Sequence, residues 1–473
     1  MGPAAMLVVV SDLHLTDGSV AASLPGGAFV VFAERLRDLA FSASWRADGE
    51  YRPIEGIELL LLGDVFDFAT SARWLDTDLR PWHHAASDDL AELYYAIASG
   101  IVTHNQAALQ VLRGFAGDGA IRVPPGTSQG KPDFQAPGQA VPVRIHPMVG
   151  ECDWPLHQEG AAYDRLRRLV ARHLGMVDEP QGDGDPDQEN DSPDSASRIW
   201  AHDPTENEDL RDVLSGHGVV ARHGDVFDPF SFDGDRQACS LTDCFAIELF
   251  VPFCKQMELV SEDVLALTAL AGVRELSAVR PWLLIPRWIE YAVRPSRART
   301  TQGGLITERW NRLADEMLEC GYLRDRKAAN RRTSIDLLRQ EIKLRSHTSV
   351  AMTASGNTSY DARLQDDLWL GTSLADRARD EPEIRDRAAR AVVYGHTHQA
   401  ESVPLYGGSR VTTSSQVYFN TGTWRRVIHR VRSSGRSPEY VLADSMRFVV
   451  FYRDGERGGR PYETWTATLG VEA

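Results

Sequence analysis

The stretch Leu59-Leu60-Leu61-Leu62-Gly63-Asp64-Val65-Phe66-Asp67 decides the fold, because an apolar run stops at a glycine that is followed by two carboxylates. A run of four leucines bounded by turn residues is typical of a buried strand in a sheet that is covered on both faces. Gly63 lets the backbone turn sharply after the strand. Because α/β sheets bind ligands at the carboxyl ends of their strands, the stretch predicts a functional site at Asp64.

The same pattern occurs at four other places, where an apolar run is again followed by Asp, Glu or His. These stretches are Val8–His14, Pro147–Asp153, Val219–Asp225 and Val392–His398. A single buried His or Asp is more often a hydrogen-bonded structural residue than a metal ligand. Five such stretches in this order, each after a predicted strand, favour metal ligands instead.

The ordered set resembles the calcineurin-like metallophosphoesterase superfamily, whose members carry D-x-H, G-D-x-x-D, G-N-H-D, H and G-H-x-H at successive strand ends. The resemblance covers residues 6–230 and 388–455. It implies an α/β fold, a two-sheet αββα metallophosphoesterase sandwich. The core would be formed by residues 1–230 and 388–473, with a large helical cap insertion at 231–387. In layout, including His223-Gly224-Asp225, the chain looks nearest to the UDP-diacylglucosamine diphosphatase branch.

The resemblance also implies a dinuclear metal centre. Seven residues are expected as ligands: Asp12, His14 and His398 for one ion, Glu151, His223 and His396 for the other, and Asp64 as the bridge. Asp67 and Asp225 are expected to orient these ligands without touching a metal. Mixed carboxylate and imidazole ligands suit two divalent transition-metal ions, with Mn favoured and Fe, Zn, Co or Ni as alternatives.

The function implied is that of a metal-dependent phosphohydrolase. It would cleave a phosphodiester, phosphomonoester or pyrophosphate bond by attack of a metal-bridging hydroxide. The expected partner is a small phosphorylated or pyrophosphate-linked substrate held under the cap. A formal net charge of −16 argues against a general nucleic-acid-binding role, because phosphate binding needs a basic face. A nuclease stays open as an alternative, and it requires a continuous basic groove that reaches the metals.

The third motif departs from the family pattern, since Gly150-Glu151-Cys152-Asp153 stands in place of Gly-Asn-His-Asp. Glu151 adds a negative charge to the centre, and Cys152 replaces a histidine that commonly protonates the leaving group or contacts the phosphate. Cys152 and Asp153 are therefore the expected catalytic residues, with reduced turnover as an open outcome. A further alternative is a catalytically impaired binding or regulatory protein that keeps the fold.

Periodicity and turn residues predict the other elements. The expected strands are Met6–Val10, Ile57–Leu62, Val141–Val149, Gly218–Arg222, Ala391–Tyr394, Gln416–Asn420 and Met446–Tyr452. Helices are expected at Ala28–Phe41, at 88–115 with Ser87 or Asp88 as the cap, and at Tyr163–Leu174. The insertion is expected to hold helices at Leu241–Leu259, Glu262–Ala271, Arg274–Tyr291, Leu305–Met317 and Thr333–Leu344. The acidic, Pro/Gly-rich segment 178–194 is expected to be a disordered or loosely held loop.

Two segments of the insertion have alternative interpretations. The basic residues between Arg324 and Arg345 form either a solvated helix face or an anion-binding lid. The aromatic run Trp282–Tyr291 forms either core, or the wall of an acyl or nucleobase pocket, or a peripheral membrane contact. Five scattered cysteines and no visible targeting or membrane-spanning segment predict a cytoplasmic protein.

Overall fold

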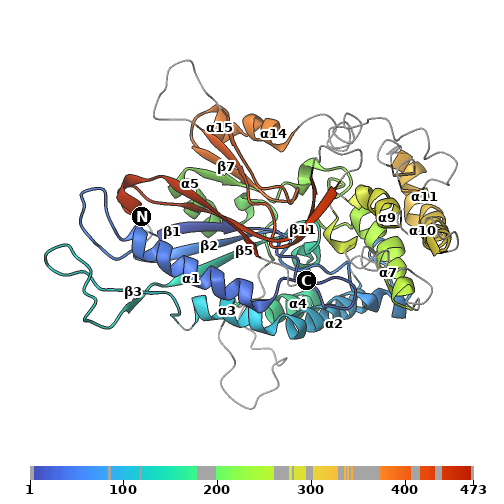
Figure 1. Ribbon diagram of the computed structural model, residues 1–473, viewed down its shortest axis with the longest axis horizontal. Helices are drawn as coiled ribbons and strands as arrows, with labels where there is room; N and C mark the ends of the chain where they lie inside the picture. The colour runs from blue at the N-terminus through green and yellow to red at the C-terminus, as the bar shows by residue number, and fades with distance from the viewer. Residues whose placement is uncertain are drawn as a thin grey trace, which may run out of the picture.

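The computed structural model describes residues 5–83, 87–117, 119–177, 199–259, 276–279, 282–293, 302–328, 335–336, 338–339, 342–344, 373–405, 416–431 and 439–469. The expected loop at 178–194 and the expected helix at 262–271 lie outside these residues, as does most of the segment 333–344. The described part is a mixed α/β structure, as the sequence predicts (Figure 1).

The larger sheet has the strand order β10-β11-β1-β2-β5, and β12 also pairs with β11. Its strands are β1 (Ala5–Val10), β2 (Gly56–Leu62), β5 (Val143–Met148), β10 (Arg425–Val431), β11 (Glu439–Phe451) and β12 (Tyr462–Leu469). The first three are parallel, and β11 runs antiparallel to β1, β10 and β12. The parallel strands therefore end at one edge, where the predicted motifs follow.

The smaller sheet has the strand order β6-β7-β9-β8. Its strands are β6 (Val219–Ala221), β7 (Ala391–Tyr394), β8 (Glu401–Pro404) and β9 (Val417–Asn420). Strands β6, β7 and β9 are parallel, and β8 is antiparallel to β9. The bounds predicted for β7 are confirmed. A separate two-stranded pair joins β3 (Arg122–Val123) to β4 (Gln139–Ala140).

Both faces of the larger sheet are covered, which explains why β1 and β2 are buried at every position. Successive side chains of a strand point to opposite faces. Leu59 and Leu61 accordingly lie in a core shared with helices, whereas Leu60 and Leu62 lie in a second core with Val393 and Phe419 of the smaller sheet. The four-leucine run thus serves two cores at once.

Helices cover the outer face of each sheet (Figure 1). The larger sheet packs against α1 (Gly26–Ala43), α2 (Asp88–His104), α3 (Gln106–Ala116) and α4 (Ala161–His173). The smaller sheet packs on its outer face against α14 (Leu374–Asp380) and α15 (Pro382–Arg385). Helix α5 (Glu208–His217) lies beside β6 and contributes Leu210 and Leu214 to the core between the sheets.

The single helix predicted over 88–115 is wrong, since the chain breaks at Asn105 into α2 and α3. Asn105 leaves helical geometry at φ −103° and ψ 22°. Its side-chain amide donates to Thr16 O at 2.7 Å and to Ile101 O at 2.8 Å. The break therefore ties the helix pair to the loop that follows β1. The predicted cap is confirmed, because Ser87 Oγ accepts a hydrogen bond from Leu90 N.

The insertion has a hydrophobic core of its own, with Phe250, Trp310 and Ile289 among its buried residues. Its described helices are α6 (Leu241–Phe245), α7 (Val251–Glu258), α9 (Ile285–Val293), α10 (Gln302–Leu318) and α11 (Gly321–Ala328). The predicted helix over 241–259 is interrupted by a π-helical turn at Ala246–Phe250. Pro252, the second residue after this turn, lacks the N–H that a regular helix needs.

The cap contacts the core through several side chains, among them Arg80 of the core and Glu248 of the cap, which form an ion pair. Trp82 stacks on Tyr322 of the cap with ring centroids 5.2 Å apart, and Trp154 Nε1 donates to Asp243 Oδ1 at 3.4 Å. Helices α14 and α15 belong to the range expected for the insertion, but they pack on the smaller sheet. In the part of the chain that the structure describes, no helix combines the length and apolarity needed to cross a membrane.

Candidate metal centre

The loops that follow β1, β2 and β7 hold their predicted ligands in a strained backbone conformation. The described chain has seven non-glycine residues with positive φ, and five of them are predicted ligands: Asp12, His14, Asp64, His396 and His398, with φ between 44° and 69°. Left-handed geometry is costly for such residues and persists only where the surroundings enforce it. Its concentration at the ends of three strands makes this edge the candidate functional site.

One group of ligand atoms comes from the first and last motifs. His14 Nε2 and His398 Nε2 are 2.8 Å apart, and Asp12 Oδ1 lies 3.7 Å from the first and 3.3 Å from the second. All three side chains are buried. Imidazole nitrogens and a carboxylate oxygen at such spacing are compatible with a shared divalent ion.

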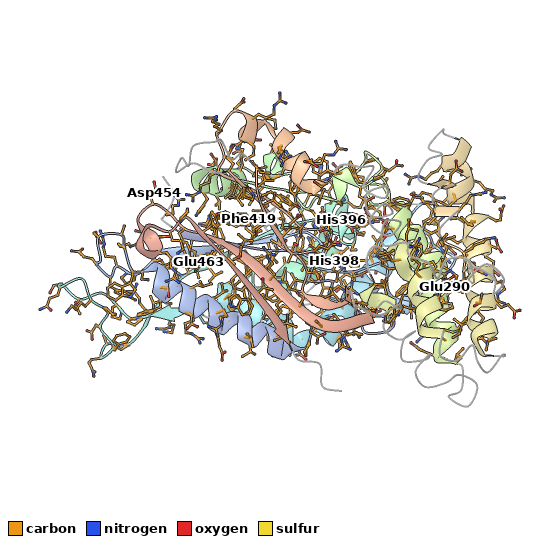
Figure 2. The ribbon with its side chains drawn as sticks, turned by 45° about the horizontal axis from the view of Figure 1, so that its top comes forward. Glu290, His396, His398, Phe419, Asp454 and Glu463 are labelled. Atoms are coloured by element: carbon orange, nitrogen blue, oxygen red, sulfur yellow. The ribbon has the colours of Figure 1, made fainter. Side chains whose placement is uncertain are left out.

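A second group comes from the other motifs. Glu151 Oε2 lies 2.9 Å from His223 Nε2, and the Glu151 carboxylate lies 2.9 Å from His396 Nδ1. These three ligand atoms are also mutually within 4.8 Å. Figure 2 shows His396 and His398 on the side of the core that faces the cap helices.

Asp64 lies between the two groups. Its Oδ2 atom is 3.6 Å from His14 Nε2 and 3.4 Å from His223 Nε2, and it is buried without a hydrogen-bond partner. Its other oxygen, Oδ1, accepts a hydrogen bond of 2.8 Å from Cys152 N. One carboxylate oxygen is therefore fixed by the backbone, while the other faces histidines of both groups. The structure brings all seven predicted ligands to one edge of the two sheets.

Two glycines are required for this close approach. A Cβ at Gly63 would lie 2.7 Å from His223 Nδ1, and a Cβ at Gly150 would lie 2.6 Å from His223 Nε2. Gly63 also has a φ of +84°, which side-chain-bearing residues rarely adopt. The glycines of the motifs thus make room for His223, whose Nδ1 lies 2.8 Å from Leu62 O.

The electrostatics of the centre favour cations. Burial lowers the pKa of the His223 imidazole, but Asp64 and Asp12 outweigh burial and hold that pKa well above 6.5. Burial acts on His396 in the same direction, and Glu151 and Asp228 again raise its pKa well above 6.5. A cluster that holds protons so tightly has a negative potential. Divalent ions would compete with those protons for the same nitrogens.

The structure gives the two predicted catalytic residues different places. Asp153 is fully buried, and its carboxylate accepts hydrogen bonds from Gly150 N and Val65 N at 2.7 Å each, with longer contacts to Asp64 N and Phe66 N. Through these hydrogen bonds, Asp153 fixes the backbone of the loops that carry Asp64 and Glu151. The Cys152 thiol lies within 4.8 Å of ligand atoms of His14 and Asp67, beside the first group.

Asp228 was not predicted from the sequence, although its carboxylate contacts the ring of the predicted ligand His396. Asp228 Oδ2 lies 3.0 Å from His396 Nε2, which leaves His396 Nδ1 turned towards Glu151. The signal was present, because Gly224-Asp225-Val226-Phe227-Asp228 repeats the pentapeptide of the second motif. In the repeat, Asp225 pairs with Arg236 at 2.6 Å.

Two buried guanidinium groups near the centre were also missed. Arg236 lies in the field of Asp225, Glu151 and Asp64, and although burial lowers its pKa, these carboxylates raise it. Arg425 is fully buried near Asp67, Cys152 and Asp12, and it donates to Ser277 O at 2.7 Å. Both offset part of the negative charge of the ligands. No local pattern marks either residue, because only the folded chain brings them to this edge.

The turn from Asn420 to Trp424 also supports the centre. Trp424 N and Thr423 Oγ1 donate to Asp12 O at 2.9 and 2.8 Å, and Asn420 Nδ2 donates to Gly395 O at 2.7 Å. These hydrogen bonds fix the backbone at the first and last motifs.

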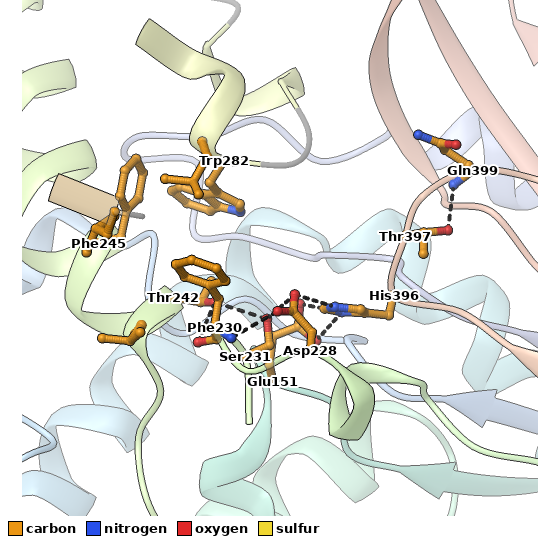
Figure 3. Close-up of a pocket in the computed structure, with 13 residues that line it drawn as sticks. Glu151, Asp228, Phe230, Ser231, Thr242, Phe245, Trp282, His396, Thr397 and Gln399 are labelled. Carbon is orange, nitrogen blue, oxygen red and sulfur yellow. Dashed lines mark hydrogen bonds and ion pairs between the residues drawn. The ribbon is translucent and has the colours of Figure 1, made fainter. Parts of the chain in front are cut away.

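A pocket connects the second ligand group to the cap (Figure 3). Its polar end is formed by Glu151, Asp228 and His396, and Phe230, Phe245 and Trp282 line its apolar part. With its open mouth included, the pocket has a volume of about 780 Å³. A pocket with one polar end and an apolar wall suits a small organic ligand.

Two basic side chains of the cap, Arg326 and Lys343, form ion pairs away from the pocket. Arg326 pairs with Asp233 at 2.7 Å, and Lys343 pairs with Asp315. Neither residue lines the pocket, and none of the described residues that line it is Lys or Arg. These two residues fit neither interpretation: they do not line the pocket, Arg326 is buried and not solvated, and Lys343 lies outside the described helices.

No protein-family model matches the chain, and no curated protein is significantly similar to it. The geometry of the site is therefore the basis for inferring a function. That geometry offers two sets of three ligands with one carboxylate between them, buried charge compensation, and an adjoining pocket.

Proposed function

We propose that the chain is a dinuclear metal-dependent phosphohydrolase of the calcineurin-like metallophosphoesterase type. The position of Asp64 is the observation that carries this proposal, because Oδ2 faces His14 of one group and His223 of the other. The layer order supports it, since helices, two face-to-face sheets and further helices correspond to an αββα sandwich. Carboxylate and imidazole donors fit divalent transition-metal ions such as Mn.

At these ligands, a bound metal pair supplies an activated water and stabilises charge on the phosphoryl oxygens. The residues of the chain provide the positioning. Cys152 N holds Asp64 in the bridging orientation, and Asp228 holds the His396 ring from its Nε2 side. Burial excludes bulk water from the first ligand group, which strengthens every charge interaction there.

The pocket supports a small phosphoester or pyrophosphate that carries an apolar group. The scissile phosphate would lie at the end formed by Glu151 and His396, and the apolar group would contact Phe230 and Trp282. Such a pocket leaves no basic track for a nucleic-acid backbone among its described lining residues. A small substrate is therefore favoured over a nuclease substrate.

A catalytically impaired binding protein is the second candidate, and Glu151 is the observation that favours it. Its carboxylate occupies the position between His223 and His396, where the family pattern has a neutral ligand. An extra negative charge weakens the attraction for a phosphate anion. Arg236 opposes this effect, because it lies in the field of Glu151 and Asp64.

Metal content and turnover test the proposal together. Protein reconstituted with Mn²⁺ and desalted should hold about two Mn ions per chain and hydrolyse at least one member of a panel of phosphomonoester, phosphodiester and pyrophosphate substrates. Asp64→Asn should lose Mn and turnover. Asp212→Asn, at a side chain that is 80% exposed, is the matched control and should retain both.

The outcomes separate the candidates. Two Mn ions without turnover on any substrate would support the impaired binding protein. Absence of bound metal, with Asp64→Asn indistinguishable from wild type, would overturn the metal-dependent hydrolase.

A further inference from the structure

A second cluster of ligand-type side chains lies outside the centre described above. His157 ends the 3₁₀ turn Trp154–His157, which follows the third motif. His202 precedes the 3₁₀ turn Pro204–Glu206, and Glu206 ends that turn. Backbone contacts hold the two segments side by side: Val149 N donates to Ala201 O at 3.0 Å, and Trp200 N donates to Leu156 O at 3.3 Å. The cluster therefore draws its side chains from two segments that are distant in sequence and adjacent in the fold.

The three side chains converge as the ligands of the main centre do. Each offers one ligand atom, and these atoms lie within 4.8 Å of one another. His202 Nδ1 is 2.8 Å from Glu206 Oε1, close to the 2.9 Å between His223 Nε2 and Glu151 Oε2 in the main centre. The two imidazole rings have centroids 5.0 Å apart and stand at 84°.

His157 has the orientation of a metal-ligating histidine. Its Nδ1 lies 2.8 Å from the carbonyl oxygen of Trp200 and donates to it, since a carbonyl can only accept. That bond leaves the lone pair on Nε2, the tautomer in which metal-binding histidines are held by a carbonyl or carboxylate on the other nitrogen.

We propose that His157, His202 and Glu206 form a separate mononuclear site for Zn²⁺. Two imidazoles and one carboxylate are a typical three-ligand set for zinc, and water fills the fourth position. The side chains of His202 and Glu206 are 26% and 35% exposed, which gives the ion and the water access from solvent. The site shares no residue with the dinuclear centre and does not rest on the proposed hydrolase activity.

A bound ion would hold two segments of the chain together. It would link the segment that carries Glu151, Cys152 and Asp153 to the segment that carries Trp200 and Ala201. Because the chain between these segments is long, one shared ion removes more freedom from the unfolded chain than from the folded chain. Zn²⁺ is therefore expected to stabilise the fold even where the main centre is disabled.

The test compares Zn²⁺ binding in variants that leave the main centre intact. Metal-free protein without an affinity tag is titrated with Zn²⁺ by calorimetry, and Zn is counted by elemental analysis after desalting. His157→Gln and Glu206→Gln should each bind one ion fewer per chain than wild type. His173→Gln is the matched control, because His173 Nδ1 also lies 2.8 Å from a backbone carbonyl, that of Leu169, and it should bind as wild type does.

A thermal readout keeps the proposal independent of the hydrolase. In an Asp64→Asn background, Zn²⁺ should still raise the midpoint temperature of unfolding. When Glu206→Gln is added to that background, the Zn²⁺-induced rise in the midpoint should be smaller. Glu206 is exposed, so this variant should fold even if His157→Gln does not. Equal Zn stoichiometry in wild type, His157→Gln, Glu206→Gln and His173→Gln would overturn the proposed site.

Discussion

Glu151 is the residue on which the activity of the centre depends most directly. Burial raises the pKa of its carboxyl, but His396 and His223 outweigh burial and hold that pKa well below 4.5. The group is therefore ionised beside Asp64, whose own pKa is raised by burial and by Glu151. Arg236 and Arg425 lie near enough to offset this charge, so the departure from the family pattern is embedded in a compensated environment.

The variants Glu151→Asn and Cys152→His test whether the third motif limits turnover. If the departures are inhibitory, the double variant should raise kcat on a generic phosphodiester by at least about tenfold, since a well-placed general acid contributes about 10²–10⁴-fold. The two single variants separate the charge effect from the acid effect. Steady-state kinetics at fixed Mn²⁺ provides the measurement. An unchanged or lower kcat in the double variant would show that Glu151 and Cys152 suit the substrate of this protein.

Sequence-based prediction reached some residues of the centre and not others. Asp12 and Asp64 follow β1 and β2 after one intervening residue, and because these strands are neighbours and parallel, their carboxyl ends lie side by side. His396 follows β7 of the smaller sheet, so its place beside them was implied only by the family resemblance. The role of all three as metal ligands stays a prediction. Arg236 and Arg425 could not be predicted, because burial near the centre is set by how distant segments pack. Asp228 was missed although the repeated pentapeptide at 224–228 offered a local signal.

Among the elements, strands were predicted more closely than helices. β7 has its predicted bounds because a short apolar run between turn residues leaves little freedom. The apolar periodicity of two long predicted helices did not indicate their interruptions, at Asn105 and at the π-helical turn before Val251. In the structure, the side-chain hydrogen bonds of Asn105 mark the first interruption, and Pro252 lies just beyond the second.

The loops at the ends of β2 and β5 are joined by Asp153. In Asp153→Asn, one side-chain oxygen becomes an amide nitrogen that cannot accept from Gly150 N or from Val65 N. The free energy of unfolding should fall by about 1–3 kcal/mol, because a buried donor loses its partner. Since these N–H groups position Asp64, metal affinity should fall by about 10–100-fold.

Chemical denaturation and Mn²⁺ titration of Asp153→Asn provide the two readouts. Asp164→Asn is a useful control, because Asp164 lies in α4, outside the metal-ligand loops. Wild-type metal affinity in Asp153→Asn would contradict a positioning role for Asp153.

In the whole molecule, the two sheets and the cap contribute different parts of the candidate site. The sheets bring the ligands to one edge, and the cap adds Phe245 and Trp282 to a pocket whose polar end belongs to the core. The buried strands of the core were accessible to prediction because each is a short apolar run, whereas their arrangement in two sheets was implied only by the family resemblance. The pocket was foreseen only as one of three interpretations of the aromatic run that contains Trp282, because its two ends come from segments that are far apart in sequence.

The pH dependence of stability should reverse when metal is added. In the metal-free chain, the raised pKa values of His14, His223 and His396 give stability that is fully present below 6.5 and is lost as pH rises through the folded-state values. The lowered pKa of Glu151 gives stability that is present above 4.5 and lost as pH falls below it. Metal-free protein should therefore be most stable between these two limits. Metal ions replace the protons on the imidazoles, so the stabilisation by Mn²⁺ should increase with pH. Thermal unfolding with and without Mn²⁺ across pH 5–8 measures both curves, and a metal-induced rise that does not grow with pH would contradict binding at these histidines.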